Sequence, residues 1–226
     1  MKETYVLSIR GIVPYSLTVS GLIENQRERY GISYGKKEEL HVSIASVPIH
    51  SRIDYEHFLK EVVLTIKPIF FKQIPCAFGM IEFKKRPKGY FFGSFPVEPT
   101  NVLSMLHAGV QMAFGSFYKG SPTEKDEEYA LAGNIYDEEE IKLMKEHGNP
   151  RSFQRYRPHV TFGIVNDKVA GLLGKTLEDS CSFFVNWSAK DVCGKQFDLN
   201  LFEIRIDKYD ENGGVLVAKQ MINIVQ

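Results

Sequence analysis

LHVSI at residues 40–44 and PHVTF at residues 158–162 follow one pattern. In each stretch a histidine is followed by valine, then by a hydroxyl residue and then by a large apolar residue. Both stretches lie in β-rich runs, and side chains alternate between the two faces of a strand. We therefore expect the histidine and the hydroxyl residue of each stretch to share one face of a strand, while the apolar residues of the other face pack on helices.

The side chains that this pattern singles out are His41, Ser43, His159 and Thr161. Two such strands facing one another would bring together two imidazoles and two hydroxyls, which suits phosphodiester chemistry. A neutral imidazole can accept a proton from the nucleophile, and a protonated one can donate a proton to the leaving oxygen. Both forms are available near pH 7, because the unperturbed pKa of histidine is ~6.5. The hydroxyls can donate hydrogen bonds to the non-bridging phosphoryl oxygens.

One H-x-[ST] stretch alone would carry little weight, because hydroxyl residues are common. Two copies in separate halves of the chain predict a functional pair. The reaction needs no metal, and the sequence has no H-E-x-x-H motif and no clustered His/Asp spacing typical of a metal site. We therefore expect neither a metal nor a cofactor. Of the other histidines, His57 and His107 fall on expected amphipathic helices, and we interpret both as structural.

Arg157 is a further candidate for binding substrate, since it stands two residues before His159. If the strand extends that far, its guanidinium shares the histidine face and can bind a phosphate through two hydrogen bonds. Pro158 can instead mark the start of the strand and leave Arg157 in the preceding loop. The sequence leaves both alternatives open.

Basic and aromatic side chains add weaker signals. The basic run at residues 84–88 can contact a polynucleotide backbone, or it can be the solvated tip of a hairpin. Several aromatic residues can stack on a base or simply belong to the core. These are Tyr90, Phe92, Tyr156 and Phe162.

Composition limits the class of protein. The chain has 226 residues, enough for one large domain or two small lobes. Lys and Arg number 28, as do Asp and Glu, so any polyanion must be met by a local patch. The three cysteines form no C-x-x-C pair, and we expect free thiols in a reducing compartment. No signal peptide or membrane span is indicated, so we expect a cytoplasmic protein.

The expected elements alternate between helix and strand without repeating β-α-β units, which favours an α+β fold over a doubly wound parallel sheet. Pro48 is expected to end the second strand, and Asp54 to cap the helix that follows. Strands are expected at 4–13, 40–47, 78–83, 90–95, 159–165, 181–187, 199–208 and 214–225. Helices are expected at 15–30, 54–66, 100–117, from 137 to about 147, and at 167–177.

A charged segment near 119–155 contains two acidic runs, at 124–128 and 137–140. We interpret it as the connection between two halves, either a solvated linker or a lid. An interaction protein that works through this segment is a rival interpretation of the whole chain.

The pair of motifs beginning at His41 and His159 resembles the signature of the two-histidine (2H) phosphoesterase superfamily. That group includes RNA 2′,5′ ligase-like proteins and plant-type cyclic nucleotide phosphodiesterases. The resemblance covers nearly the whole chain except the segment near 119–155. It implies a single bilobal α+β domain over residues 1–226, with two pseudo-symmetric lobes, an antiparallel sheet in each lobe and helices outside. The two histidines would then face each other across a phosphate in the groove between the lobes.

The expected activity is that of a metal-independent phosphodiesterase acting on a 2′,3′-cyclic phosphate, a 2′,5′ linkage or an RNA-terminal phosphodiester. Which histidine is the acid and which the base stays open, because the motifs are nearly identical. The alternative is a catalytically silent module that binds a nucleotide or an RNA end in the same groove. We expect a nucleotide or RNA-end substrate, no membrane association, no obligatory protein partner and a monomer.

Overall fold

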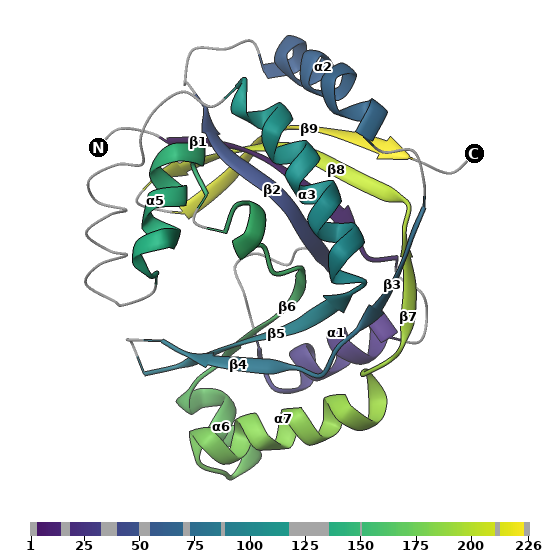
Figure 1. Cartoon of the computed structure of the whole chain (residues 1–226). Coiled ribbons are helices and arrows are strands. Elements are labelled where there is room, and N and C mark those ends of the chain that lie inside the picture. The colour runs from purple at the N-terminus through teal and green to yellow at the C-terminus, as the bar shows by residue number, and fades with distance from the viewer. Residues whose placement is uncertain are drawn as a thin grey trace.

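The computed structural model describes residues 4–14, 19–32, 40–49, 55–69, 73–86, 89–117, 136–149, 151–210 and 213–223. Nine strands of this part form one antiparallel sheet (Figure 1). They are β1 (Thr4–Ile12), β2 (His41–Ile49), β3 (Ile74–Phe78), β4 (Glu82–Lys85), β5 (Phe91–Glu98), β6 (His159–Val165), β7 (Gln196–Leu199), β8 (Leu201–Asp210) and β9 (Gly213–Asn223). The α-helices are α1 (Val19–Arg29), α2 (Tyr55–Ile66), α3 (Thr100–Gly115), α5 (Glu138–His147), α6 (Asp167–Leu173) and α7 (Leu177–Asp191).

The sheet consists of two halves that meet at the two motif strands. Its order is β7-β3-β5-β6-β2-β1-β8-β9, with β4 paired to β5. At the centre, β2 and β6 pair only through Val42 and Val160. We call β2, β1, β8 and β9 with their helices the His41 lobe, and β6, β5, β4, β3 and β7 with their helices the His159 lobe. The expected bilobal α+β fold with antiparallel strands in each lobe is confirmed, and the strands of the two lobes form one continuous sheet.

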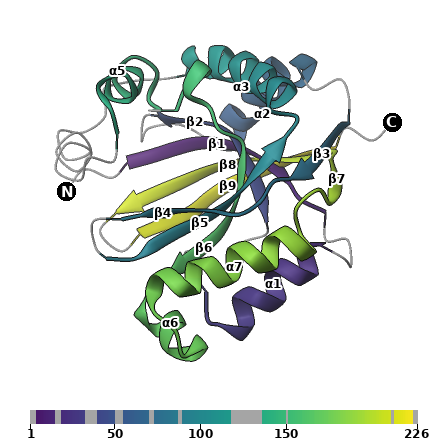
Figure 2. The same ribbon diagram turned by 60° about the horizontal axis from the view of Figure 1, so that its bottom comes forward.

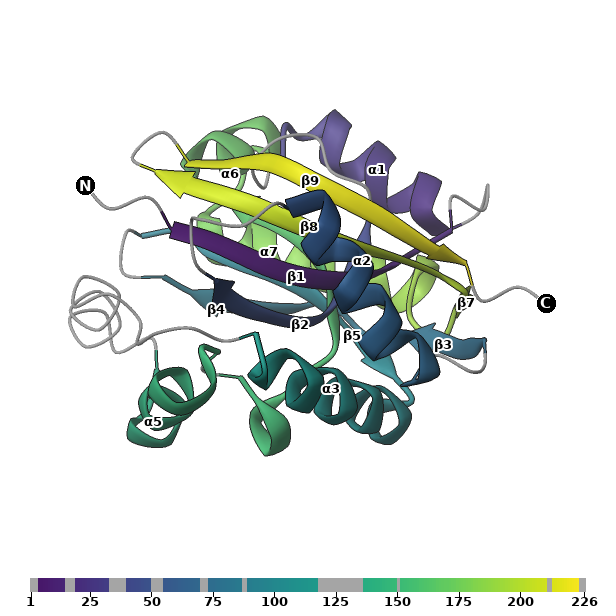
Figure 3. The ribbon, with the colours of Figure 1, turned by 90° about the horizontal axis from the view of Figure 1, so that it is seen from above.

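The two lobes are not successive halves of the chain. β3, β4 and β5 precede the charged segment but belong to the His159 lobe, and β8 and β9 return to the His41 lobe. Helices α2 and α3 cover the His41 lobe, with α2 lying across β8 and β9 (Figure 3). Helices α1, α6 and α7 cover the His159 lobe from the opposite end (Figure 2). One continuous core of buried apolar residues runs through both lobes.

Each motif strand has a β-bulge at the same place in its motif, which is one feature that the two lobes share. Between β1 and β2 the register shifts so that Ile44 is the extra residue, and between β5 and β6 the extra residue is Phe162. Each is the fourth residue of its motif and is buried together with the small residue that follows it, Ala45 or Gly163. A bulge turns the rest of the strand over without breaking its pairing. β2 can therefore bury five residues and β6 four, while the histidine and the hydroxyl residue of each strand stay on the other face.

Several expectations for the elements were wrong or incomplete. The strand expected at 78–83 is interrupted, because β3 ends at Phe78 and β4 begins only at Glu82. Residues 181–187 belong to helix α7, whose buried residues Cys181, Phe184 and Ser188 recur at helical spacing. β2 does not end at Pro48, because Pro48 still pairs with Val6 of β1. The other edge of β2 is unpaired at Pro48, because β6 pairs with β2 only at Val42. A proline is tolerated there because its missing N–H costs no ladder bond on an unpaired side. Strand β7 was not foreseen.

Other expectations were met. The acidic run at 137–140 begins α5 with a capping box between Asp137 and Glu140, and Gly148 ends this helix in the left-handed conformation. The three cysteines are free thiols. The expected cap at Asp54 and residues 119–135 of the charged segment lie outside the described residues. None of the described helices is long and apolar enough to cross a membrane.

Candidate active site

The pairing of β2 with β6 brings the four motif side chains to one face of the sheet. Because the strands are antiparallel and Val42 lies opposite Val160, the next pairs outward are His41 with Thr161 and Ser43 with His159. The two valines are fully buried on one face, so the four motif side chains share the other face. Each imidazole thus has the hydroxyl residue of the other motif as its neighbour across the strands.

The two histidines are diagonal neighbours in this arrangement, since each lies one residue before its valine. Diagonal side chains on one face of an antiparallel pair are about 7–8 Å apart. That separation leaves room for one phosphoryl group between the imidazoles of His41 and His159. Both histidines are partly buried, Thr161 is partly buried and Ser43 is exposed.

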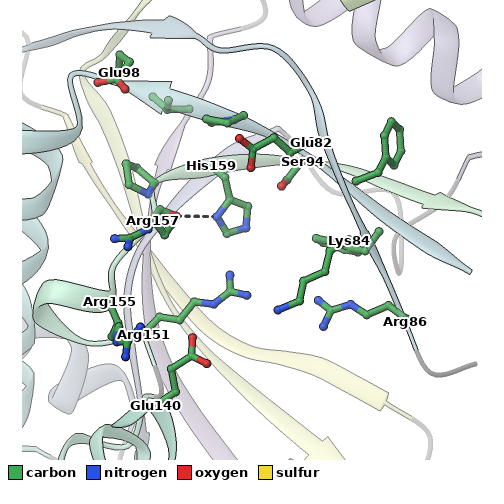
Figure 4. Close-up of a pocket in the computed structure, with 15 residues that line it drawn as sticks. Glu82, Lys84, Arg86, Ser94, Glu98, Glu140, Arg151, Arg155, Arg157 and His159 are labelled. Atoms are coloured by element: carbon green, nitrogen blue, oxygen red, sulfur yellow. Dashed lines mark hydrogen bonds between the residues drawn. The ribbon is translucent and has the colours of Figure 1, made fainter. Parts of the chain in front are cut away.

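His159 is held in one tautomer by its own backbone neighbourhood. Its Nδ1 lies 2.8 Å from the carbonyl oxygen of Arg157, which can only accept, so Nδ1 carries the proton and Nε2 has a free lone pair (Figure 4). Burial lowers the pKa of His159 below its ordinary value, and the positive charge of Arg151 lowers it further. The bond to the Arg157 carbonyl opposes that shift. In the unliganded protein the neutral form is therefore favoured, ready to accept a proton at Nε2.

A cavity of about 540 Å³ adjoins His159 on the open face of the His159 lobe. This volume is typical of pockets for nucleotide-sized ligands. His159 and Arg157 line it, whereas His41, Ser43 and Thr161 are not among its lining residues. The remaining lining residues are Glu82, Phe83, Lys84, Arg86, Phe92, Ser94, Pro96, Val97, Glu98, Glu140, Arg151, Arg155 and Pro158.

Arg157 lies in the loop before β6, as the second of the two alternatives has it, because β6 begins at His159. Its guanidinium donates to the carbonyl oxygens of Gln154 and Tyr156 at 3.3 and 3.0 Å. Its backbone carbonyl orients the imidazole of His159, a role that the sequence did not indicate. The cation whose charge acts on His159 is Arg151, from the loop that follows α5.

The basic run and the aromatic residues divide between the site and the core. Lys84 and Arg86 line the cavity together with Phe92, and the Arg86 guanidinium lies 5.3 Å from the centre of the Phe92 ring. Tyr156 and Phe162 are buried, so neither presents a face to a base. β4 and β5 pair as the two arms of the expected hairpin, and the Arg86 N–H donates to the Tyr90 carbonyl, while residues 87–88 lie outside the described residues.

A buried pair of rings braces the first motif strand from behind. His107 of α3 is completely buried and stacks on Tyr156, with ring centres 4.1 Å apart and planes 3° from parallel. Its Nδ1 donates to the carbonyl of Ile44 at 2.5 Å, and its Nε2 accepts from the N–H of Phe153 at 2.9 Å. The Tyr156 hydroxyl donates to the carbonyl of Ser43 at 3.0 Å. The expectation that His107 is structural agrees with these contacts, which fix the bulge that positions Ser43.

On the His41 lobe the open face continues as a row of charged residues. Arg10 lies beside Ser43 in the sheet, and Glu203 lies beside Arg10. Arg205 of the same strand donates through Nε to Asp207 at 2.7 Å and through Nη1 to Glu203 at 3.5 Å. The polar character of the motif strands therefore extends across this lobe. No group of three or more His, Cys, Asp or Glu residues within the described part could hold a metal ion.

Comparison with known proteins gives matches among solved structures. The chain is similar to Kluyveromyces marxianus Usb1 with uridine monophosphate, at 11% identity and a TM-score of 0.47, over 93% of this chain and 97% of that one. It is similar to E. coli LigT in apo form, at 8% identity and a TM-score of 0.47, over 98% of this chain and 99% of that one. No family model and no curated protein matches the sequence.

Proposed function

We propose that this protein is a phosphodiesterase that uses two histidines as general base and general acid on a 2′,3′-cyclic, 2′,5′-linked or RNA-terminal phosphodiester. The observation that carries the proposal is the pairing of β2 with β6 through Val42 and Val160. That pairing sets His41 and His159 diagonally on one face, each next to a hydroxyl residue.

In the proposed reaction His159 is the base and His41 the acid. The Nε2 atom of His159 takes a proton from the attacking water or sugar hydroxyl as its oxygen bonds to phosphorus. The bond from phosphorus to the leaving sugar oxygen breaks, and protonated His41 donates a proton to that oxygen. Neutral His159 in the free protein supports this assignment, because its pKa is lowered while Nδ1 stays engaged. Each turnover leaves the two protonation states exchanged, and exchange with solvent restores them.

Ser43 and Thr161 are proposed to hold the non-bridging oxygens of the phosphoryl group. Replacing either by alanine is expected to lower kcat/KM roughly 10-fold or more, because one hydrogen bond to developing charge is lost. Replacing Ser43 by threonine, or Thr161 by serine, keeps the hydroxyl and should restore most of the rate. Steady-state kinetics on the four variants measures this. Alanine variants as active as the wild type would remove the hydroxyls from the mechanism.

The silent binding module is the competing function, and it has the same groove. A panel of nucleoside 2′,3′-cyclic phosphates and short 2′,5′- and 3′,5′-linked oligonucleotides, incubated with the protein in excess EDTA, separates the two. Turnover of at least one member in EDTA supports the proposal and names the substrate. Binding of panel members without any turnover, with or without added divalent ions, would favour the silent module.

A further inference from the structure

The cavity beside His159 carries more positive charge than one phosphate requires. Five cationic and three carboxylate side chains line it. Strand β4 contributes Glu82 and Lys84 to the lining; Phe83 also borders the cavity, but its ring packs on Phe162 and Phe184. Lys84 and Arg86 lie on the far side of the cavity from His159 (Figure 4). A ligand that fills the cavity must therefore extend from the histidine to β4.

Several of the lining charges are already engaged within the protein. Arg155 pairs with Asp137 at 3.1 Å, and Arg157 is bound to backbone carbonyls. Glu140 accepts from the Asp137 N–H in the capping box of α5. Within the described residues, neither Arg151 nor Lys84 forms an ion pair with a carboxylate, although Glu82 lines the same cavity. Among the remaining lining charges the cations Lys84, Arg86 and Arg151 outnumber the carboxylates Glu82 and Glu98, and the cations lie at both ends of the cavity.

An aromatic ring also lies at the end of the cavity that Lys84 and Arg86 form. Phe92 of β5 pairs with Lys84 across the strands and lines the cavity, with the Arg86 guanidinium near its ring. Proteins bind single-stranded nucleic acid with an aromatic ring next to cationic side chains, because the base stacks on the ring and the phosphate pairs with the charges.

We propose that Lys84, Arg86 and Phe92 form a subsite for the nucleotide next to the scissile phosphate, with Arg151 between the two phosphates. This inference rests on the proposed function and sharpens its substrate class: a single-stranded oligonucleotide binds through two phosphates, and a cyclic mononucleotide through one. The subsite determines affinity for the chain and takes no part in proton transfer.

The test compares Lys84→Ala and Arg86→Ala with Lys85→Ala. Lys85 is the matched control, because it adjoins Lys84 in sequence but forms an ion pair with Glu178 at 3.7 Å. With a short RNA oligonucleotide, each subsite variant should raise KM several-fold at low salt and leave kcat nearly unchanged. With a cyclic mononucleotide none of the three should differ from the wild type. An equal effect on both substrates, an effect of Lys85→Ala as large as that of Lys84→Ala, or no effect at all would overturn the subsite.

A binding experiment keeps this inference separate from the proposed chemistry. In a His41→Ala background, whose cavity lining is intact, the affinity for a fluorescein-labelled RNA hexamer is measured by anisotropy at several salt concentrations. Adding Lys84→Ala should reduce the slope of log K against log[salt] by about 0.7, the share of one phosphate contact on a single strand. An unchanged slope contradicts the subsite even if turnover is found. A reduced slope supports it even if no panel member is cleaved.

Discussion

Replacing His159 by alanine is expected to lower kcat/KM on the best phosphodiester substrate by at least about 10²-fold, the lower bound for a positioned acid or base. The variant loses Nε2, the only atom at this position with a free lone pair, while Nδ1 merely binds the Arg157 carbonyl. His41→Ala should cause a loss of similar size, because the leaving oxygen then departs without a proton. Single-turnover and steady-state rates with purified variants measure both effects.

The two losses should not multiply. Groups that act on the same transition state are non-additive, so the double variant should be little slower than either single variant. His57→Ala is the control, since His57 lies on the exposed surface of α2 beside Glu61 at 3.3 Å. The rate of a variant is compared only if its unfolding temperature equals that of the wild type. A double variant that retains the wild-type rate would end the two-histidine account.

The second large effect is expected on stability. Replacing His107 by alanine should lower the free energy of unfolding by about 3–5 kcal/mol, as truncation of a fully buried ring does. The change leaves the Phe153 N–H and the Ile44 carbonyl without their partners and opens a cavity beside Tyr156. His57→Ala should change stability by no more than about 0.5 kcal/mol. Urea unfolding at pH ~7.5 compares the two variants with the wild type. If His107→Ala lowers the free energy of unfolding by less than about 1 kcal/mol, the stacked rings of His107 and Tyr156 do not stabilise the motif strand.

At lower pH, the free energy of unfolding of the His107→Ala variant should come closer to that of the wild type. Burial lowers the pKa of His107 in the folded protein, against the opposing effect of its bond to Ile44. The unfolded chain binds the proton at the ordinary pKa of ~6.5, so this histidine stabilises the fold fully above that pH and progressively less below it. When the urea unfolding is repeated at pH ~5.5, the difference in free energy of unfolding between the wild type and His107→Ala should therefore be smaller than at pH ~7.5. A larger difference at the lower pH would mean that the protonated imidazole of His107 is tolerated in the core.

The faces of the motif strands could be predicted from the sequence because alternation is a local property. His41 and Ser43 lie opposite the buried Val42, as the pattern indicates. The bulges also had a signal in the sequence, since each motif continues with a small residue, Ala45 or Gly163, after its large apolar one. The helix that begins with the acidic run at 137–140 could be predicted for the same local reason, and the structure adds its capping box.

What the sequence could not provide was long-range. Nothing local shows that β3, β4 and β5 join the His159 lobe, because the choice of strand partner depends on the whole sheet. Residues 181–187 are rich in aromatic and β-branched side chains and were interpreted as a strand, yet packing of Phe184 against Phe162 selects the helix. Arg151 lay in a loop without a pattern, so only the structure places its charge beside His159.

The rate of the wild-type protein against pH, as kcat/KM in excess EDTA, tests the central claim most directly. A site that needs neutral His159 and protonated His41 should give a bell around neutrality, with limbs that belong to the coupled pair. Because burial lowers the pKa of His159 in the free protein, the acid limb should lie below ~6.5. A rate that rises steadily with pH, or one that EDTA abolishes and a divalent ion restores, would contradict acid–base catalysis by the two histidines.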